Sequence, residues 1–343
     1  MTSFTAEDKK VKFAIVGCGH IGKRHAEMVA RNEEAELVAL CDIADKNSLG
    51  IERFEVPFFA SIDELLASDL EVDVLNICTP NGVHSEQAEK ALDKGIHIVV
   101  EKPIGLSKAK CESVIFKALR NHKHVFAVMQ NRYSPPSEWL KDIVENKIIG
   151  DVFTVQVNCY WNRDDRYYKK GGWKGTSDLD GGTLFTQFSH FIDIMYWLFG
   201  DVDNISGRST NFSHPNTEFE DTGVVNFDFV NGGMGSMNFS TSVWGQNLES
   251  SITVIGEKGS VKVAGQYMDK VDYCHVQDYE MPQLAPSNPP NDYGEYKGSA
   301  ANHHYVIQNV VDVITGKSEI ATNALEGMKV VEMIERMYKI VRD

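Results

Sequence analysis

Short apolar runs alternate with amphipathic stretches along the first part of the chain. The predicted strands cover residues 13–16, 37–41, 72–78, 97–100 and 125–129. The predicted helices cover residues 23–32, 45–54, 84–94 and 107–121, and a further helix begins after Ser61. Strands that alternate with helices predict a parallel, doubly wound sheet, in which ligands bind at the carboxyl ends of the strands. We therefore expect an α/β Rossmann-type domain over residues 1–132.

The pattern changes after about Tyr133. A connecting helix over 137–146 is followed by longer runs in which apolar and polar residues alternate. These runs predict strands over 153–158, 222–230, 235–241, 250–256 and 260–264, and two helices follow over 303–314 and 323–341. Such alternation is typical of antiparallel sheets with one covered face. We predict a second, α+β domain over 133–343 with a large open, mostly antiparallel sheet, and a last helix that can pack back on the first domain.

Four apolar residues in the predicted sheet favour self-association. They are Val224, Phe227, Met234 and Met237. A sheet face that no helix covers needs another partner, and a second copy of the chain supplies one. We expect a homodimer or homotetramer that assembles through this sheet.

Charge and composition exclude several classes of function. The formal net charge is −15 over 343 residues, which disfavours nucleic acid and anionic membranes as partners. The chain has no apolar run long enough to span a membrane and begins with polar residues, so we expect a cytoplasmic protein. Six scattered cysteines lack metal-ligand spacing, which predicts buried thiols and no metal site.

A glycine-rich turn joins the first predicted strand to the first helix. Gly17, Gly19 and Gly22 follow the G-x-G-x-x-G pattern, with His20 and Ile21 inside it. The first glycine permits the tight turn, the second admits a pyrophosphate, and the third allows close packing of helix on strand. Asp42 ends the next strand, twenty positions after Gly22. A carboxylate there accepts from a ribose hydroxyl and repels a 2′-phosphate, so we expect NAD rather than NADP.

Three further segments end strands and should lie on the same rim as the glycine turn. They are Thr79-Pro80-Asn81, Glu101-Lys102-Pro103 and Gln130-Asn131-Arg132. Hydride transfer from an alcohol needs a general base beside the hydroxyl, and Lys102 is the candidate in this domain. The alternative is a surface lysine at a strand end.

A second candidate for proton transfer lies in the later domain. His190 belongs to a predicted helix that follows Gly181-Gly182, with Thr186 and Asp193 on the same face. A helical histidine among aromatic residues is often a core residue, so position alone leaves its role open.

These motifs together resemble the Gfo/Idh/MocA oxidoreductases. The resemblance covers nearly the whole chain and rests on the glycine turn, Asp42, Thr79-Pro80-Asn81 with His84, Glu101-Lys102-Pro103 and the His190 helix. It implies NAD(P)-dependent oxidation of a sugar or cyclitol hydroxyl, with Lys102 and His190 in proton transfer. The implied cofactor contacts are Gly17, Gly19, His20, Ile21, Gly22, Asp42, Thr79, Pro80, Asn81, His84, Glu101, Lys102 and Gln130.

One position departs from the family pattern. Many members carry an acid four residues before the histidine, where this chain has Thr186. A hydroxyl is a poor proton relay at neutral pH. Either His190 works with Lys102 alone, or Gln187 helps to hold the substrate, or the chemistry differs.

A basic and aromatic cluster precedes the His190 helix. Residues 161–174 contain five basic and two acidic side chains, with aromatic residues between them. Arginine and lysine suit phosphates, and aromatic rings suit a base or a sugar face. The stretch resembles the branch of the family that oxidises UDP-linked amino-sugar acids at C3. We expect substrate contacts from Arg132, Arg163, Lys170, Trp173, Thr186, Gln187 and His190.

Two other functions stay open at this point. One is a dehydrogenase of a free sugar or inositol. The other is a nicotinamide-binding sensor without turnover, for which Thr186 is the sole indication.

Overall fold

The computed structural model describes residues 10–294 and 296–342. It divides into two compact units. Unit 1 takes in the chain up to Gly105, Ala109–Val128 and His303–Leu325, and unit 2 takes in Leu106–Lys108, Met129–Asn302 and the residues from Glu326 onward. The chain passes from unit 1 to unit 2 between Val128 and Met129, four residues before the predicted boundary between residues 132 and 133. Residues 303–325 return to unit 1, so neither unit is one continuous segment.

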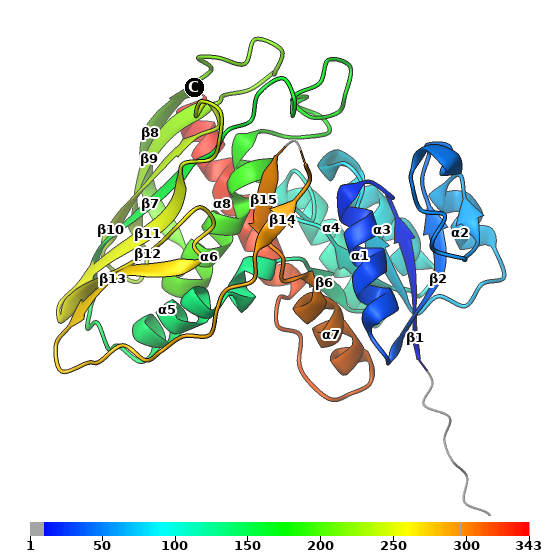
Figure 1. Ribbon diagram of the computed structural model, residues 1–343, viewed down its shortest axis with the longest axis horizontal. Coiled ribbons are helices and arrows are strands. Elements are labelled where there is room, and N and C mark those ends of the chain that lie inside the picture. The colour runs from blue at the N-terminus through cyan, green and yellow to red at the C-terminus, as the bar shows by residue number, and fades with distance from the viewer. Residues whose placement is uncertain (1–9, 295, 343) are drawn as a thin grey trace, which may run out of the picture. The chain divides into compact units, whose positions relative to one another are not determined.

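Unit 1 contains a six-stranded parallel sheet in the order β3-β2-β1-β4-β5-β6 (Figure 1). The strands are β1 Val11–Val16, β2 Ala35–Cys41, β3 Phe58–Phe59, β4 Val74–Ile77, β5 His97–Val100 and β6 Val125–Ala127. This strand order is that of a dinucleotide-binding Rossmann sheet, whose direction of winding reverses between β1 and β4. The predicted doubly wound parallel sheet is therefore confirmed.

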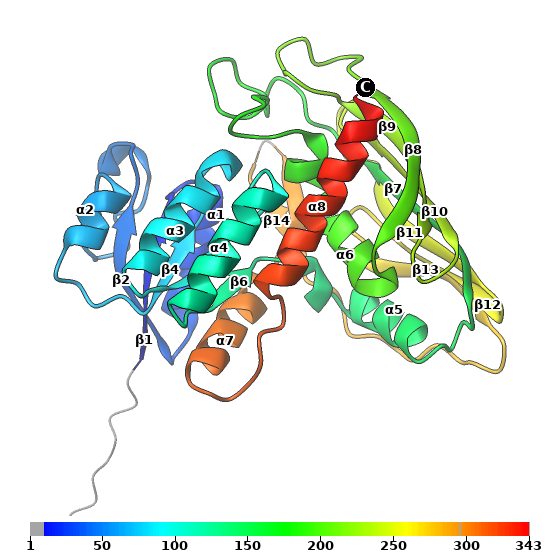
Figure 2. The same cartoon turned by 180° about the vertical axis from the view of Figure 1, so that it is seen from behind.

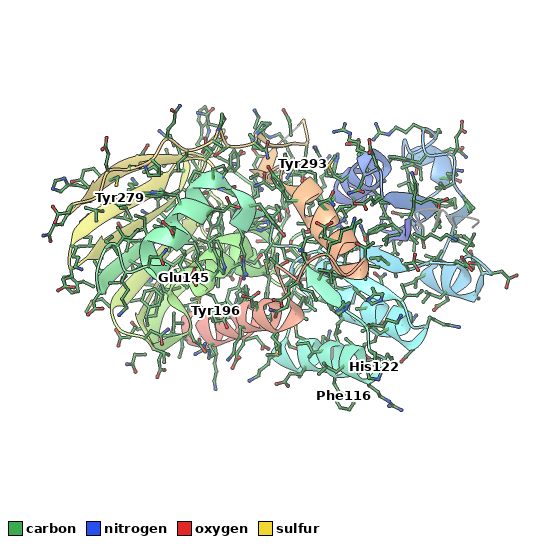
Figure 3. All side chains as sticks on the ribbon, turned by 90° about the horizontal axis from the view of Figure 1, so that it is seen from below. Phe116, His122, Glu145, Tyr196, Tyr279 and Tyr293 are labelled. Carbon is green, nitrogen blue, oxygen red and sulfur yellow. The ribbon has the colours of Figure 1, made fainter. Side chains whose placement is uncertain are left out.

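Helices cover both faces of this sheet. They are α1 His20–Arg31, α2 Ile62–Ala67, α3 His84–Asp93, α4 Lys108–Arg120 and α7 His303–Ile314. Helix α1 lies on one face, and α3 and α4 lie on the other (Figures 1 and 2). Helix α4 buries Cys111, Val114 and Ala118 against the sheet, while Phe116 projects outward and is 67% exposed (Figure 3).

The helix predicted over 45–54 is wrong. The structure has only a 3₁₀ turn, η1 Lys46–Ser48, in which the Asp45 side chain accepts from the Asn47 amide. Asn47 and Ser48 favour turns over helices, and Gly50 has φ +64°. By contrast, α2 begins directly after Ser61 as predicted, and Ser61 caps it, since its hydroxyl accepts from the Glu64 amide at 3.2 Å.

Unit 2 is built on a mixed, mostly antiparallel sheet in the order β13-β12-β11-β7-β10-β9-β8. Its strands are β7 Val152–Tyr160, β8 Val202–Thr210, β9 Thr222–Phe229, β10 Met234–Ser240, β11 Glu249–Gly256, β12 Gly259–Ala264 and β13 Lys270–Val276. Only β7 and β10 run parallel among these neighbours. The α+β prediction for the second domain is confirmed, although the sequence pattern did not reveal β8 and β13.

One face of this sheet carries the helices α5 Pro135–Glu145, α6 Ser189–Phe199 and α8 Ala324–Val341 (Figure 2). The short elements of the unit are η3 Gln130–Tyr133, the π-helical turn η4 Leu184–Phe188, and the hairpin of β14 Pro290–Asp292 and β15 Lys297–Ala300. Aromatic packing under the sheet joins Trp161 of the chain after β7 to Phe188 and Phe191.

The predicted interface residues divide between the two faces. Phe227 and Met237 are buried on the helix-covered face, so that part of the prediction is wrong. Val224 and Met234 lie on the opposite face and are 42% and 60% exposed. Successive residues of a strand point to opposite faces, so Val224 and Phe227, three positions apart, lie on opposite faces of the sheet. Self-association through the open face stays a prediction.

Candidate active site

The glycine turn of unit 1 has no room for side chains at two of its three glycines. Gly17 has φ +88°, and a Cβ there would lie 2.7 Å from the Cys78 backbone. A Cβ on Gly22 would lie 1.8 Å from the Gly17 carbonyl oxygen. At Gly19, by contrast, a Cβ would meet no described atom within 4 Å. The turn thus packs tightly on its inner side and leaves space beside Gly19.

This space adjoins the start of α1. Gly19 is the N-cap of the helix and, as a glycine, has no side chain that could cap it. The amide groups and dipole at a helix start attract anions such as phosphates. The glycine turn therefore fits the pyrophosphate of a dinucleotide.

Asp42 is fixed beside the turn from the end of β2. Its Oδ2 accepts from the Cys18 amide at 2.6 Å, and its Oδ1 accepts from the Ala44 amide at 2.8 Å. The side chain is half-buried. A carboxylate has about four acceptor positions, so capacity for a ribose hydroxyl remains.

His84, a predicted cofactor contact, is a buried residue with a backbone partner at each ring nitrogen. It is fully buried at the start of α3, with Nε2 2.8 Å from the Thr79 carbonyl oxygen and Nδ1 2.7 Å from the Pro103 carbonyl oxygen. Burial lowers the pKa of His84, although these carbonyl groups act in the opposite direction. The two ring nitrogens thus contact backbone carbonyl groups of Thr79-Pro80-Asn81 and Glu101-Lys102-Pro103, two of the segments predicted to lie on the rim.

Lys102 is half-buried directly after β5, and its neighbour Glu101 is buried. The Glu101 carboxylate lies against His25 and His303, both of which are also buried. These three residues form the one group of potential metal ligands among the described residues. The predicted cofactor contact at Glu101 is thus a side chain that faces two histidines.

His190 lies in unit 2, next to Gln130. The imidazole is 4% exposed, and Gln130 Nε2 lies 3.5 Å from His190 Nε2. The amide nitrogen can only donate, so His190 Nε2 accepts in this arrangement. The Gln130 Oε1 atom is buried and has no hydrogen-bond partner in the part of the chain that the structure describes.

The predicted face of Thr186, His190 and Asp193 is altered by a π-helical turn. Residues Leu184–Phe188 form this turn and the α-helix begins only at Ser189, which changes the spacing before His190. The Thr186 hydroxyl donates to the buried carboxylate of Asp180. An acid therefore adjoins Thr186, although it comes from six residues upstream.

Arg132 points to an internal partner. Its guanidinium forms two hydrogen bonds with Asp193 and another, at 3.1 Å, with Glu326. Arg132 is 5% exposed. Two carboxylates therefore balance the charge of Arg132 within the protein, and its predicted contact with the substrate stays a prediction.

Arg163 is a buried cation with an unusual environment. It is 2% exposed, and its hydrogen bonds go to Gln187 Oε1 at 2.8 Å, to Asn247 Oδ1 at 3.3 Å and to two backbone carbonyl groups. Among the residues that the structure describes, no carboxylate pairs with it. The guanidinium also lies 5.2 Å from the ring centres of Tyr167 and Tyr296. Burial lowers the pKa of Arg163, but an arginine stays charged at neutral pH.

A second cation lies at the same two tyrosine rings. Lys174 Nζ is 3.8 Å from the Tyr167 ring centre and donates to the Tyr296 hydroxyl at 3.0 Å. The predicted Lys170 is exposed, and Trp173 is half-buried. The basic character of the stretch 161–174 revealed the cluster, but Tyr296 and Asn247 are far away in the sequence and carried no signal.

Family models match most of both units. Residues 11–129 match the oxidoreductase family with an NAD-binding Rossmann fold, and residues 138–262 match the GFO/IDH/MocA C-terminal domain. No helix in the described part of the chain is long and apolar enough to cross a membrane.

Solved structures and curated proteins with related sequences agree with this. The chain is 29% identical to the WlbA dehydrogenase of Bordetella pertussis, solved with NADH and UDP-GlcNAcA, with a TM-score of 0.85 over 98% of this chain and 97% of that one. It is 32% identical to the WlbA dehydrogenase of Chromobacterium violaceum, solved with the same ligands, again with a TM-score of 0.85, over 100% and 97% of the two chains. It is also 29% identical to glucose-6-phosphate 3-dehydrogenase of Bacillus subtilis, over 82% of this chain and 83% of the relative.

The glycine turn, the strand order of unit 1 and the matches across both units lead to one conclusion. The chain belongs to the Gfo/Idh/MocA family and is an NAD-dependent oxidoreductase of the sugar-dehydrogenase type.

Proposed function

We propose that this enzyme oxidises a secondary hydroxyl of an anionic nucleotide sugar, namely the C3 hydroxyl of a UDP-linked amino-sugar acid. The observation that carries the proposal is Arg163, a buried guanidinium without a carboxylate partner among the described residues. A buried charge is costly unless it is paired, so an anionic ligand would compensate for it. The likeness to two WlbA dehydrogenases solved with UDP-GlcNAcA supports the same substrate class.

The cofactor would be held by the glycine turn of unit 1. The start of α1 would receive the pyrophosphate beside Gly19, and Asp42 would accept from the ribose hydroxyl. When bound, NAD supplies the hydride acceptor. The negative charge of Asp42 disfavours the 2′-phosphate of NADP.

Two side chains of this protein would handle the hydroxyl proton. We assign Lys102 as the general base and His190 as its partner in proton transfer. The Gln130 amide suits this role for His190. Its NH₂ group donates to a neutral Nε2, and after rotation of the amide its Oε1 accepts from a protonated Nε2.

The side chains around Arg163, namely Gln187, Tyr167, Tyr296 and Lys174, would recognise the substrate together with it. Gln187 holds the guanidinium from one side, because its Oε1 accepts from Arg163 Nε and its Nε2 donates to Tyr167 Oη at 2.7 Å. The rings of Tyr167 and Tyr296 offer apolar faces for a sugar or a base. Lys174 adds a second positive charge at the same rings.

A substrate panel tests the proposal. NADH formation is followed at about 340 nm with a UDP-linked N-acetylamino-sugar acid, the matched UDP-sugar with a neutral C6 alcohol, a hexose 6-phosphate, glucose and myo-inositol. We expect the sugar acid to give the highest kcat/KM, at least about 100-fold above the neutral UDP-sugar, the loss typical of an unpaired buried charge. Equal or higher kcat/KM with inositol or glucose would contradict the proposal.

The same panel addresses turnover itself. A protein that bound NADH tightly but oxidised none of these alcohols would favour a redox sensor over a dehydrogenase.

A further inference from the structure

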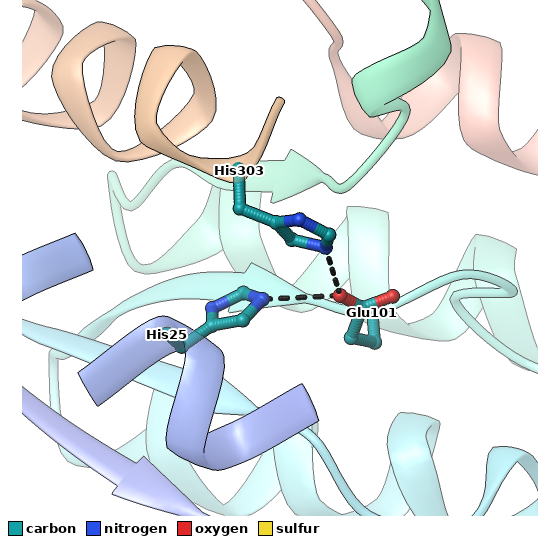
Figure 4. A group of neighbouring side chains, drawn as sticks. All are labelled: His25, Glu101 and His303. Carbon is teal, nitrogen blue, oxygen red and sulfur yellow. Dashed lines mark hydrogen bonds and ion pairs between the residues drawn. The ribbon is translucent and has the colours of Figure 1, made fainter. Parts of the chain in front are cut away.

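Glu101 is the buried carboxylate next to the proposed general base. Its side chain is 9% exposed, and its Oε1 lies 3.0 Å from His25 Nε2 and 3.4 Å from His303 Nε2 (Figure 4). The three residues come from α1, from the end of β5 and from the start of α7. Three elements that are far apart in the sequence thus converge on one carboxylate oxygen.

Asn76, which adjoins His25, determines which atoms of this cluster donate and which accept. Asn76 Nδ2, on β4, lies 3.0 Å from His25 Nδ1. An amide nitrogen only donates, so His25 Nδ1 accepts and the ring hydrogen is on Nε2. His25 Nε2 then donates to Glu101 at 3.0 Å. The hydrogen bonds therefore run from Asn76 through His25 to Glu101.

The Glu101 carboxylate is ionised in this environment. Burial alone would raise its pKa, but the adjoining imidazoles of His25 and His303 outweigh burial and hold the pKa well below its ordinary value. A buried carboxylate with two imidazole neighbours has a strongly preferred position. The end of β5 is held further by the Glu101 amide, which donates to the Ile77 carbonyl at 3.0 Å.

The backbone on the other side of Lys102 is held as well. The Pro103 carbonyl faces His84 Nδ1 at 2.7 Å, and the same ring reaches the Thr79 carbonyl with Nε2. A neutral imidazole donates to one of these carbonyl groups at a time. Both neighbours of Lys102 in the chain are thus restrained by buried histidines: the Glu101 side chain by His25 and His303, and the Pro103 carbonyl by His84.

We propose that Glu101, held by His25 and His303, is a positioning residue that fixes the direction in which Lys102 leaves the end of β5. This inference rests on the proposed role of Lys102 as general base. Small displacements of a catalytic group cost up to about 100-fold in rate, so the restraint has a kinetic consequence. Glu101 itself need not touch the substrate or the cofactor.

A double-mutant cycle tests the proposal. Glu101→Gln keeps the shape of the side chain and removes its charge. We expect it to lower kcat about 100-fold while the Kd for NADH stays within about threefold of the parent. In a Lys102→Ala background the same substitution should cost less than about threefold, because the group it positions is gone. Glu27→Gln, on α1 in a surface ion pair with Arg53, is the matched control and should leave kcat unchanged.

The outcomes separate the two proposals. If Lys102→Ala lowers kcat strongly but leaves a measurable rate, and Glu101→Gln costs the same factor in both backgrounds, Glu101 has a structural role only and the positioning proposal is overturned. If Lys102→Ala retains full activity, the proposed general base is wrong, and the positioning proposal is overturned with it. A readout without turnover is the NMR signal of Lys102 after reductive ¹³C-methylation. It should shift in Glu101→Gln and stay in place in Glu27→Gln, and an unchanged signal in both would also overturn the positioning proposal.

Discussion

Arg132 and Asp193 form a buried, two-pronged ion pair. Arg132 Nε lies 2.9 Å from Asp193 Oδ2, and Nη2 lies 2.6 Å from Oδ1. Arg132 belongs to the 3₁₀ turn that carries Gln130, and Asp193 follows His190 by three residues on α6. The pair therefore ties together the two segments whose side chains meet at the proposed catalytic imidazole.

Breaking this pair should destabilise unit 2. Asp193→Asn leaves a buried guanidinium with half of its charge compensation, and we expect a loss of about 3–5 kcal/mol in the free energy of unfolding. Urea denaturation followed by the fluorescence of Trp197, whose ring centre is 5.4 Å from the Arg132 guanidinium carbon, measures it. Asp164→Asn, in the exposed pair with Arg166, is the control and should cost less than about 1 kcal/mol. Equal losses in the two variants would refute the assignment.

Arg163 should determine selectivity for charge. In Arg163→Met the anionic part of the substrate loses its buried partner, so kcat/KM for the UDP-linked sugar acid should fall by about 100-fold or more. The ratio of kcat/KM between that substrate and its neutral C6 analogue should approach one, which steady-state kinetics on both substrates will reveal. A uniform loss with both substrates, at an unchanged ratio, would mean that Arg163 only supports the fold.

A substitution at Gly19 should weaken cofactor binding without lowering the stability of the fold. A methyl group at this position meets no described atom within 4 Å, so Gly19→Ala should unfold at the same temperature as the parent to within a few degrees. The same methyl group would occupy the space proposed for the pyrophosphate, so the Kd for NADH should rise by about tenfold or more. Gly22→Ala is the contrast, because its Cβ would lie 1.8 Å from the Gly17 carbonyl oxygen and the fold itself should suffer. Thermal denaturation and NADH fluorescence titration distinguish the two effects, and tight NADH binding by Gly19→Ala would contradict the proposed site.

Acidification should weaken the folded state through His97. Burial, together with Lys123 and His124, lowers the pKa of His97 to about 4 from an ordinary value of 6.5. Between these values the unfolded chain takes up a proton that the folded chain does not, so stability is full above pH 6.5 and falls as the pH drops toward 4. His84 and His303, whose pKa values are also lowered by burial, act in the same direction.

The variant His97→Asn tests this contribution. Its amide oxygen can replace Nδ1, which accepts from the His124 amide at 3.0 Å, without adding a titrating group. We expect the drop in melting temperature between pH 7 and pH 5 to shrink in this variant and to remain in the exposed control His275→Asn. An identical drop in all three proteins would refute the role of His97.

Local patterns predicted the parts of the site that depend on neighbours in sequence. The G-x-G-x-x-G spacing located Gly17, Gly22 and Asp42, because strand, turn, helix and strand follow one another within one βαβ unit. The helix predicted over 45–54 failed because capping and glycine conformation, rather than apolar spacing, determine that segment.

Long-range contacts account for what the sequence did not reveal. His303 reaches Glu101 only because the chain returns to unit 1 after Met129–Asn302, which belong to unit 2, and Tyr296 packs against Tyr167 from 129 positions further along the chain. The π-helical turn before His190 likewise follows from packing and leaves no mark in the spacing of apolar residues. His303 and Tyr296 were therefore not predicted from the sequence.

The transfer of a labelled hydride tests the central claim most directly. A UDP-linked N-acetylamino-sugar acid carrying deuterium at C3 is incubated with the enzyme and NAD, and the reduced cofactor is analysed by mass spectrometry. We expect deuterium in the NADH formed by the parent enzyme and by Glu27→Gln, and NADH formation slowed by about 100-fold or more with Lys102→Ala. Reduction of NAD without deuterium in the product would place the oxidation at another carbon, and labelled NADH at the parental rate from Lys102→Ala would remove the proposed base.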